Sequence, residues 1–291
     1  MSLHEWLIAP FADFAFMRRA LVAVLAISLG SAPIGSLLVL RRMSLMGDAM
    51  AHALLPGAAI GFIVAGFSLT AMSVGSFAAG LIVALGAGFV ARATSEREDA
   101  SFAAFYLISL ALGVLLVSMY GSSVDLMHVL FGSILAVDDP ALFLMAGVAS
   151  VTLLTLAMIY RPLVVECLDP AFLRQVSARA SWVHIAFLVL SVANLVAGFQ
   201  ALGTLMAVGL MILPATAARF WSAQIGQLAL LSGAASLVSG AVGLLLSFHL
   251  KWPSGPAIVL VAGALYVVSV VAGPRGGLLL RRQRRRVHRT A

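Results

Sequence analysis

The sequence predicts an all-α protein that crosses a membrane many times. Of its 291 residues, 62% are hydrophobic and only 10% are charged, whereas about a quarter of the residues are charged in a typical soluble protein. Long stretches also lack any Asp, Glu, Lys or Arg, and one of them runs from Ala49 to Ala91. Because a helix crosses the apolar core of a bilayer in about 20 residues, these stretches indicate a polytopic integral membrane protein and exclude a water-soluble globule.

Two of the charge-free stretches are long enough for two spans each. At about 1.5 Å per residue, residues 49–91 and 180–218 would each reach well beyond one bilayer core. We expect the first to turn near Gly66 and the second near residues 198–203, where glycines favour a turn. With the other apolar stretches this predicts about nine spans, in a range of eight to ten: 20–40, 48–66, 71–91, 101–120, 141–160, 182–198, 202–218, 224–247 and 256–273.

Arginines predict the orientation of the chain. From Arg275 onward there are seven arginines and no acids, whereas residues 1–274 hold 11 basic and 11 acidic residues. We therefore expect a permease domain over 1–274 and a basic cytoplasmic tail over 275–291, which contacts anionic lipid rather than nucleic acid. Nine spans then leave Arg18 and Arg19 outside, and a tenth span or a shifted boundary would be needed to bring them inside.

An acidic residue and a histidine lie within one predicted span, where a bilayer penalises ionisable groups. Asp48 and His52 are four residues apart, so a helix places both on one face. A carboxylate and an imidazole suit zinc, manganese or iron better than calcium or magnesium. Pro56-Gly57 follows and can interrupt the helix, as in transporters with discontinuous helices. The pair is a candidate metal site; the alternative is a helix cap at Asp48 and an interhelical hydrogen bond from His52.

A second pair, Asp125 and His128, lies in residues 125–137, which are apolar but too short to cross the membrane. We expect a half-helix or a re-entrant segment there. The spacing of three again allows one helix face, which makes these residues weaker metal candidates, and a role of Asp125 as an N-cap is the stronger interpretation. His184 and Asn194 stand singly in later spans, where interhelical hydrogen bonds are the usual role, and we assign them no function.

The longest polar interval between predicted spans, residues 161–181, contains a helix start. Asp169 is typical of an N-cap and Pro170 of the first helical position, so we expect a short helix through Arg179. Phe172, Leu173 and Val176 are candidates for its apolar face. Its basic residues are Arg174 and Arg179. A short basic helix on the cytoplasmic side either docks a soluble partner or lies among the lipid headgroups.

Residues 200–219 are rich in small side chains, which let helices approach closely. Composition alone does not decide whether this stretch lines a pathway or packs in the core. The twelve methionines stand at hydrophobic positions, and we expect them to fill the core rather than to bind copper.

Several enzyme classes lack their motifs in this sequence. Lys251, the only lysine, is followed by Trp252, so there is no Walker A phosphate loop. Cys167 is the only cysteine, which excludes an intrachain disulfide or a cysteine cluster. The H-E-x-x-H and G-x-S-x-G motifs are also missing, which argues against a zinc metalloprotease or a serine hydrolase in the membrane.

Four stretches together carry a resemblance to a known family, and the first of them is specific. They are residues 40–57 (LRRMSLMGDAMAHALLPG), 130–137 (LFGSILAV), 168–172 (LDPAF) and 200–219, and residues 252–256 (WPSGP) also fit. With these stretches the chain resembles the membrane subunits of bacterial ABC importers for zinc, manganese and iron, the ABC-3 type. Residues 103–106 (AAFY) are bulkier than the family pattern.

The resemblance implies a type II ABC importer-like homodimer in the bacterial cytoplasmic (inner) membrane, with the pathway at the dimer interface. It implies a periplasmic metal-binding protein that delivers the ion and a pair of separate cytoplasmic ATP-binding subunits. Asp48 and His52 would form the gate, and the helix that begins at Asp169-Pro170 would couple the chain to the ATPase.

We therefore expect a transport subunit and no enzyme activity in this chain. It would pass a divalent transition metal, zinc first and then manganese or iron, into the cytoplasm by alternating access, with no tightly bound cofactor. A proton-driven carrier that needs no ATPase is an alternative, although more buried carboxylates than Asp48 would then be expected. A less favoured alternative is an intramembrane enzyme in which Asp48 and His52 form an acid–base pair.

Overall fold

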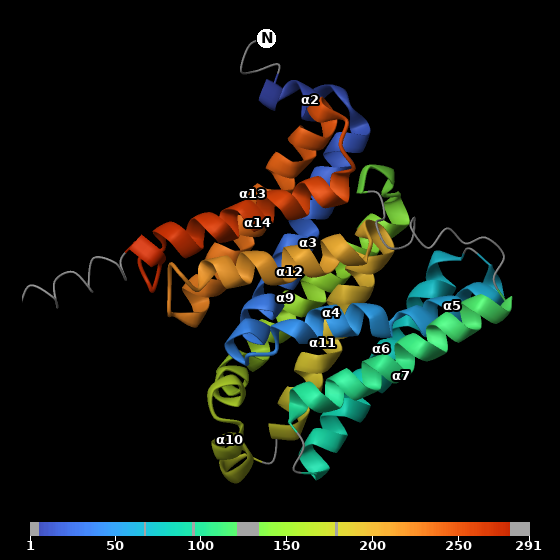
Figure 1. Ribbon diagram of the computed structural model, residues 1–291, viewed down its shortest axis with the longest axis vertical. Helices are drawn as coiled ribbons and strands as arrows, with labels where there is room; N and C mark the ends of the chain where they lie inside the picture. Colours follow the sequence, from blue (N-terminus) through green and yellow to red (C-terminus); the bar gives the residue numbers. More distant parts are fainter. Residues whose placement is uncertain (1–5, 67, 95–96, 121–133, 178–179, 280–291) are drawn as a thin grey trace, which may run out of the picture.

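Long helices build almost the whole molecule, as the computed structural model in Figure 1 shows. The structure describes residues 6–66, 68–94, 97–120, 134–177 and 180–279, and this part contains no strand. The helices are α2 (Ala9–Asp13), α3 (Ala15–Leu40), α4 (Ser44–Ala53), α5 (Leu55–Ala65), α6 (Leu69–Ala93), α7 (Glu98–Tyr120), η1 (Ile134–Ala136), α9 (Asp139–Leu168), α10 (Pro170–Val176), α11 (Ala180–Leu202), α12 (Thr204–Ala218), α13 (Ile225–Leu250) and α14 (Ser254–Ala272).

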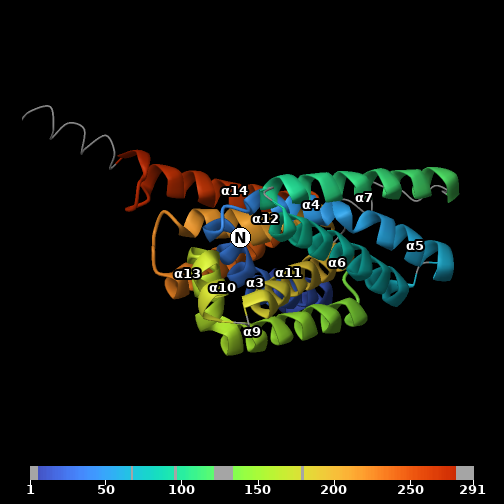
Figure 2. The same ribbon diagram turned by 90° about the horizontal axis from the view of Figure 1, so that it is seen from below.

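The predicted polytopic membrane fold is confirmed. Within the described ranges, eight helical segments are long and apolar enough to cross a membrane, with α4 and α5 counted together as one. The remaining apolar helix, α12, has 15 residues and packs against α3, α13 and α14. The count therefore agrees with about nine spans. In Figure 2, α3 and α11 lie between α9 on one face and α7 and α14 on the other.

The membrane-spanning segments alternate in direction when α4 and α5 are taken as one, so one end of the bundle collects the ends of α3, α6, α9, α12 and α14 (Figure 1). Two hydrogen bonds join the ends of α3, α12 and α14: Arg219 Nη1 donates to the Val39 carbonyl (3.5 Å), and the Arg275 amide donates to the Phe220 carbonyl (2.9 Å). Helix α10 lies at the same end (Figure 1). We refer to it below as the α10 end.

Arg18 and Arg19 lie at the opposite end, where each has a partner. Arg19 forms an ion pair with Asp139 of α9 (3.3 Å), and Arg18 donates to the Ala12 carbonyl (2.6 Å). Before α3, the residues that the structure describes form only short helical stretches, at residues 6–7 and in the five-residue helix α2. Local partners thus hold both arginines without the tenth span that the sequence left open.

The second predicted span is two helices, because the helix is interrupted at Leu54. Proline has no N–H and its ring crowds the carbonyl four residues earlier, so Pro56 interrupts the helical hydrogen bonds of the residues that precede it. Ser109 of α7 donates a hydrogen bond to the Ala53 carbonyl at this break (3.0 Å). Beyond it, Gly57 meets the backbone of Gly75 so closely that a Cβ on either would collide with the carbonyl of the other.

Two predicted boundaries were wrong. The fifth span does not end at residue 160, because α9 continues to Leu168 with Pro162 inside it. The polar interval that follows is therefore shorter than 161–181, and its helix α10 ends at Val176 instead of Arg179. Of the short segment 125–137, the structure describes the last four residues, which include η1, while Asp125 and His128 lie outside the described residues.

Candidate functional site

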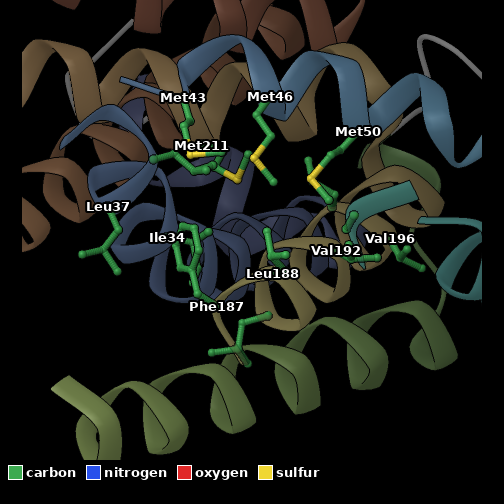
Figure 3. Close-up of a cluster of buried hydrophobic side chains, with 14 of the residues drawn as sticks. Ile34, Leu37, Met43, Met46, Met50, Phe187, Leu188, Val192, Val196 and Met211 are labelled. Carbon is green, nitrogen blue, oxygen red and sulfur yellow. The ribbon is translucent and has the colours of Figure 1, made fainter. Parts of the chain in front are cut away.

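Helix α4 has a buried face and an exposed face, which fixes the direction of Asp48 and His52. Met46 and Met50, four residues apart, are 4% and 1% exposed. Figure 3 shows Met46 and Met50 pointing from α4 toward Met211 of α12, in a cluster of buried hydrophobic side chains. Asp48 is two residues from each methionine and His52 is two residues from Met50, an offset of about 200° around the helix. The packing of the methionines therefore turns both polar side chains outward.

Asp48 and His52 lie together on the exposed face of α4. The distance from His52 Nε2 to Asp48 Oδ1 is 3.8 Å, and the two side chains are 34% and 68% exposed. This separation is longer than a hydrogen bond, so lone pairs on both groups remain available to an incoming ion. Asp48 lies within α4, whose N-cap is Met43, and the alternative of a helix cap at Asp48 was therefore wrong.

A cavity of about 350 Å³ opens beside Asp48, between α4 and the first turns of α7. It also receives Asp99, so two carboxylates face the same space. Ala103 and Tyr106, from the stretch that is bulkier than the family pattern, line the cavity from α7. Within the described part of the chain, no three His, Cys, Asp or Glu side chains gather closely enough to hold a metal ion. One copy of the chain thus offers a pair of ligands and an adjoining cavity.

Helix α10 begins as the sequence predicts. The Asp169 carboxylate accepts a hydrogen bond from the Phe172 amide (2.9 Å), and Pro170 occupies the first turn. The predicted common apolar face was wrong, because Leu173 is buried while Phe172 and Val176 are exposed. Phe172 and Val176 are one turn apart and form an apolar pair on the surface of α10. The structure describes only the backbone of Arg174, and Arg179 lies outside the described residues.

A group of polar and charged side chains joins five helices at the α10 end. This charged network consists of Arg41, Arg92, Glu98, Glu166 and His184, from or next to the ends of α3, α6, α7, α9 and α11. Arg92 pairs with Glu166 (2.8 Å), and Arg41 pairs with Glu98 (3.3 Å). Both Nη atoms of Arg41 also lie 3.3 Å from His184 Nδ1. The network thus connects helices that are far apart in the sequence.

His184 occupies the middle of the charged network. Its Nδ1 lies 3.4 Å from Glu166 Oε1, and its Nε2 lies 3.7 Å from Glu98 Oε1. Glu166 is fully buried and His184 is 2% exposed. Two of their atoms, Glu166 Oε2 and His184 Nε2, have no hydrogen-bond partner within the described structure. Each group therefore retains one unused hydrogen-bonding position.

Sequence reasoning missed this network. It assigned no function to His184 and did not single out Glu166. One signal was present, since Arg41, Arg92, Glu98 and His184 lie at or next to ends of predicted spans, and Glu166 lies in the interval 161–181, all on the side that the arginine pattern places in the cytoplasm. The pairing itself could not be read from one sequence, because the partners are as much as 143 residues apart.

Other polar and small residues pack in the core. Asn194 donates to the Thr152 hydroxyl (2.8 Å), which confirms the interpretation of Asn194 as an interhelical hydrogen bond. In α12, Met206, Ala207 and Ala215 are buried. The small residues of 200–219 that this helix contains thus mainly allow close helix packing.

Comparison with known proteins identifies the family. A model described as the ABC 3 transport family matches residues 13–273. The "Manganese transport system membrane protein MntC" of Listeria monocytogenes is 30% identical over 272 residues, which cover 94% of this chain and 96% of the relative. The "Chelated iron transport system membrane protein YfeD" of Yersinia pestis is 30% identical over 262 residues, with 90% and 86% covered.

A solved structure agrees with these relatives. "PsaBC from Streptococcus pneumoniae in complex with Fab" superposes with a TM-score of 0.82 at 28% identity, over 97% of this chain and 100% of that chain. The fold, the motifs and the matches together establish that the chain belongs to the ABC 3 transport family.

Proposed function

We propose that this permease passes a divalent transition metal ion along the exposed face of α4, between Asp48 and His52. The observation that carries the proposal is this pair, directed away from the core on an interrupted membrane helix, 3.8 Å apart and beside a cavity. The names of the relatives refer to manganese and iron transport. We therefore place manganese and iron ahead of zinc, which the sequence put first, since a carboxylate and an imidazole suit all three ions.

The exposure of Asp48 supports a second copy of the chain as partner. Asp48 is 68% exposed and lies about one turn inside the membrane segment Ser44–Ala65, where contact of an ionised side chain with lipid is unfavourable. In a symmetric dimer whose two α4 helices pack against each other, Asp48 would contact the second chain instead of lipid. The dimer would also bring together two carboxylates and two imidazoles, which is enough for a four-ligand site. Ligands shared between two chains could separate when the interface opens, and the ion would be released.

Cysteine cross-linking tests this interface. Leu45 is 85% exposed and lies one turn before Asp48 on the same face. In a Cys167→Ser background, we expect Leu45→Cys to form disulfide-linked dimers in membranes. Met158→Cys, at a residue of α9 with the same exposure, is the matched control. Cross-linking at residue 158 and not at residue 45 would place the interface elsewhere.

The energy for transport would come from a separate pair of ATP-binding subunits, since this chain has no Walker A motif. Phe172 and Val176 of α10 form an exposed apolar pair suited to a groove on such a subunit. Only Asp169 separates α10 from α9, so a push on α10 would reach the membrane helices directly. In this arrangement the α10 end and residues 275–291 face the cytoplasm of a bacterial inner membrane, and a periplasmic binding protein delivers the ion to the opposite end.

Metal uptake by reconstituted vesicles tests the proposed function. The vesicles contain the permease, with the ATP-binding subunits inside and the binding protein outside. They should accumulate radioactive manganese only when ATP is also present inside. Parallel measurements with ferrous iron and zinc rank the three ions. Uptake by the permease alone under a proton gradient would contradict the proposal and favour the proton-driven carrier.

A further inference from the structure

We propose that the charged network links α10 mechanically to α4, with Glu166 and His184 as positioning residues for transport. This inference rests on the proposed function, in which α10 contacts the ATP-binding subunit and α4 carries the metal pair.

The two ends of the network lie beside the two elements that must move together. Glu166 precedes Asp169, the N-cap of α10, by three residues. Arg41 caps the end of α3, and α4 begins after only Arg42 and Met43. The Arg42 backbone has φ of 60°, a strained conformation for a residue other than glycine, which keeps this turn tight. A displacement of Arg41 is therefore passed to the start of α4.

The network carries unused hydrogen-bonding positions at buried atoms. Breaking or incompletely pairing a buried charge is costly, and buried polar groups in proteins are nearly always hydrogen-bonded. Glu166 Oε2 and His184 Nε2 depart from this rule within the described structure. A group that served only to fasten these helices together would be expected to use all its hydrogen bonds. Unused positions at the centre of the network instead allow a second arrangement.

The His184 ring permits two such arrangements. Nδ1 of a neutral imidazole either donates or accepts a hydrogen bond, yet this atom lies near both Glu166 Oε1 (3.4 Å) and the Arg41 guanidinium (3.3 Å). When Nδ1 donates to Glu166, Arg41 is left to pair with Glu98. When Nδ1 accepts from Arg41, the proton is on Nε2, which is 3.7 Å from Glu98 Oε1.

A shift of roughly 0.7 Å would bring His184 Nε2 and Glu98 Oε1 to the distance of an ordinary hydrogen bond. Small displacements between α7, α9 and α11 would therefore exchange one bonding pattern for the other. Coupling between distant sites requires an element with two discrete arrangements that both sites can bias. Through its contacts with Glu166 on one side and Arg41 on the other, His184 provides that element.

Gly88 of α6 keeps space for the ring. A Cβ at this position would lie 3.3 Å from His184 Nε2 and 3.2 Å from Leu188 Cδ1. Contacts of that length are tighter than ordinary van der Waals packing, so an added methyl group would restrict the ring without altering any charge. Gly88→Ala thus perturbs the proposed link by shape, whereas Glu166→Gln keeps the shape and changes the charge and the hydrogen-bonding pattern.

The test measures the amount of manganese imported per ATP hydrolysed by the reconstituted three-component complex. For Glu166→Gln we expect this ratio to fall about tenfold, within the range of typical coupling between sites, while ATP hydrolysis continues. Gly88→Ala should lower the same ratio. Arg19→Gln is the control, since it breaks an exposed ion pair at the opposite end and should leave the ratio unchanged. A wild-type ratio for both Glu166→Gln and Gly88→Ala would overturn the proposed link.

A second variant covers the case in which Glu166→Gln does not fold. Arg92→Gln/Glu166→Gln removes both charges of the pair and so leaves no buried charge without a counter-ion. A folded double variant that still shows the low ratio supports the link, and one that regains the wild-type ratio overturns it. Absence of ATP-dependent uptake by the wild type would instead overturn the proposed function, so the two failures are distinguishable.

Discussion

Replacement of Met50 by alanine tests the packing that directs Asp48 and His52 away from the core. Met50 is 1% exposed and belongs to the buried cluster that contains Met46 and Met211 (Figure 3). In a bilayer, lipid is as apolar as the core, so the cost of the change arises from lost packing contacts and the cavity left behind. We therefore expect the lower end of the range for such changes, about 2 kcal/mol.

Thermal unfolding of the purified permease in detergent micelles, followed by near-ultraviolet circular dichroism, measures this effect. For a chain of 291 residues a loss of about 2 kcal/mol lowers the Tm by roughly 3 °C. The matched control is Met158→Ala, the same change at a residue that is 85% exposed on α9, and it should cost about 0.5 kcal/mol or less. Equal Tm values for the two variants would refute the buried position of Met50 and the direction assigned to Asp48 and His52.

Two further predictions concern contacts between helices. Gly57→Val places side-chain atoms where the Gly75 carbonyl lies, so we expect little folded protein by size-exclusion chromatography. The control is Gly147→Val, where a Cβ has nothing within 4 Å, and this variant should elute as the wild type. Equal yields of the two variants would disprove the close contact. The hydroxyl groups of Ser28 and Ser236 share a hydrogen bond between α3 and α13 (2.9 Å), and a double-mutant cycle with alanine should give a coupling energy of about 0.6 kcal/mol in thermal unfolding, while a value near zero would argue against this bond.

Much of the fold could be predicted because a bilayer restricts a sequence strongly. Stretches without charge must cross the apolar core as helices, so residues 49–91 and 180–218 could each be divided into two helices before their packing was known. The interruption after His52 followed from proline chemistry at Pro56. The shared face of Asp48 and His52 followed from helical spacing, and Asp169 and Pro170 marked the start of α10 in the same local way.

Features that depend on contacts between distant residues could not be predicted in this way. The continuation of α9 to Leu168 carries Glu166 into a buried site, where Arg92 compensates its charge and His184 Nδ1 lies 3.4 Å from its carboxylate. Because the sequence does not show those partners, residues 161–168 were predicted to belong to a polar loop. The burial of Leu173, which breaks the expected apolar face of α10, likewise depends on neighbouring helices. Local rules set the helices, whereas partners from other helices set the buried charges.

The central claim is that a metal ion passes between Asp48 and His52, and the initial rate of ATP-driven manganese uptake tests it most directly. The variant Asp48→Asn/His52→Gln keeps polar, uncharged side chains at both positions and weakens both ligands. Asp139→Asn is the matched control, because Asp139 is an exposed carboxylate on α9 paired with Arg19. We predict that the double variant loses about tenfold or more of the uptake rate and that the control stays near the wild-type rate. Wild-type uptake by the double variant would contradict the account.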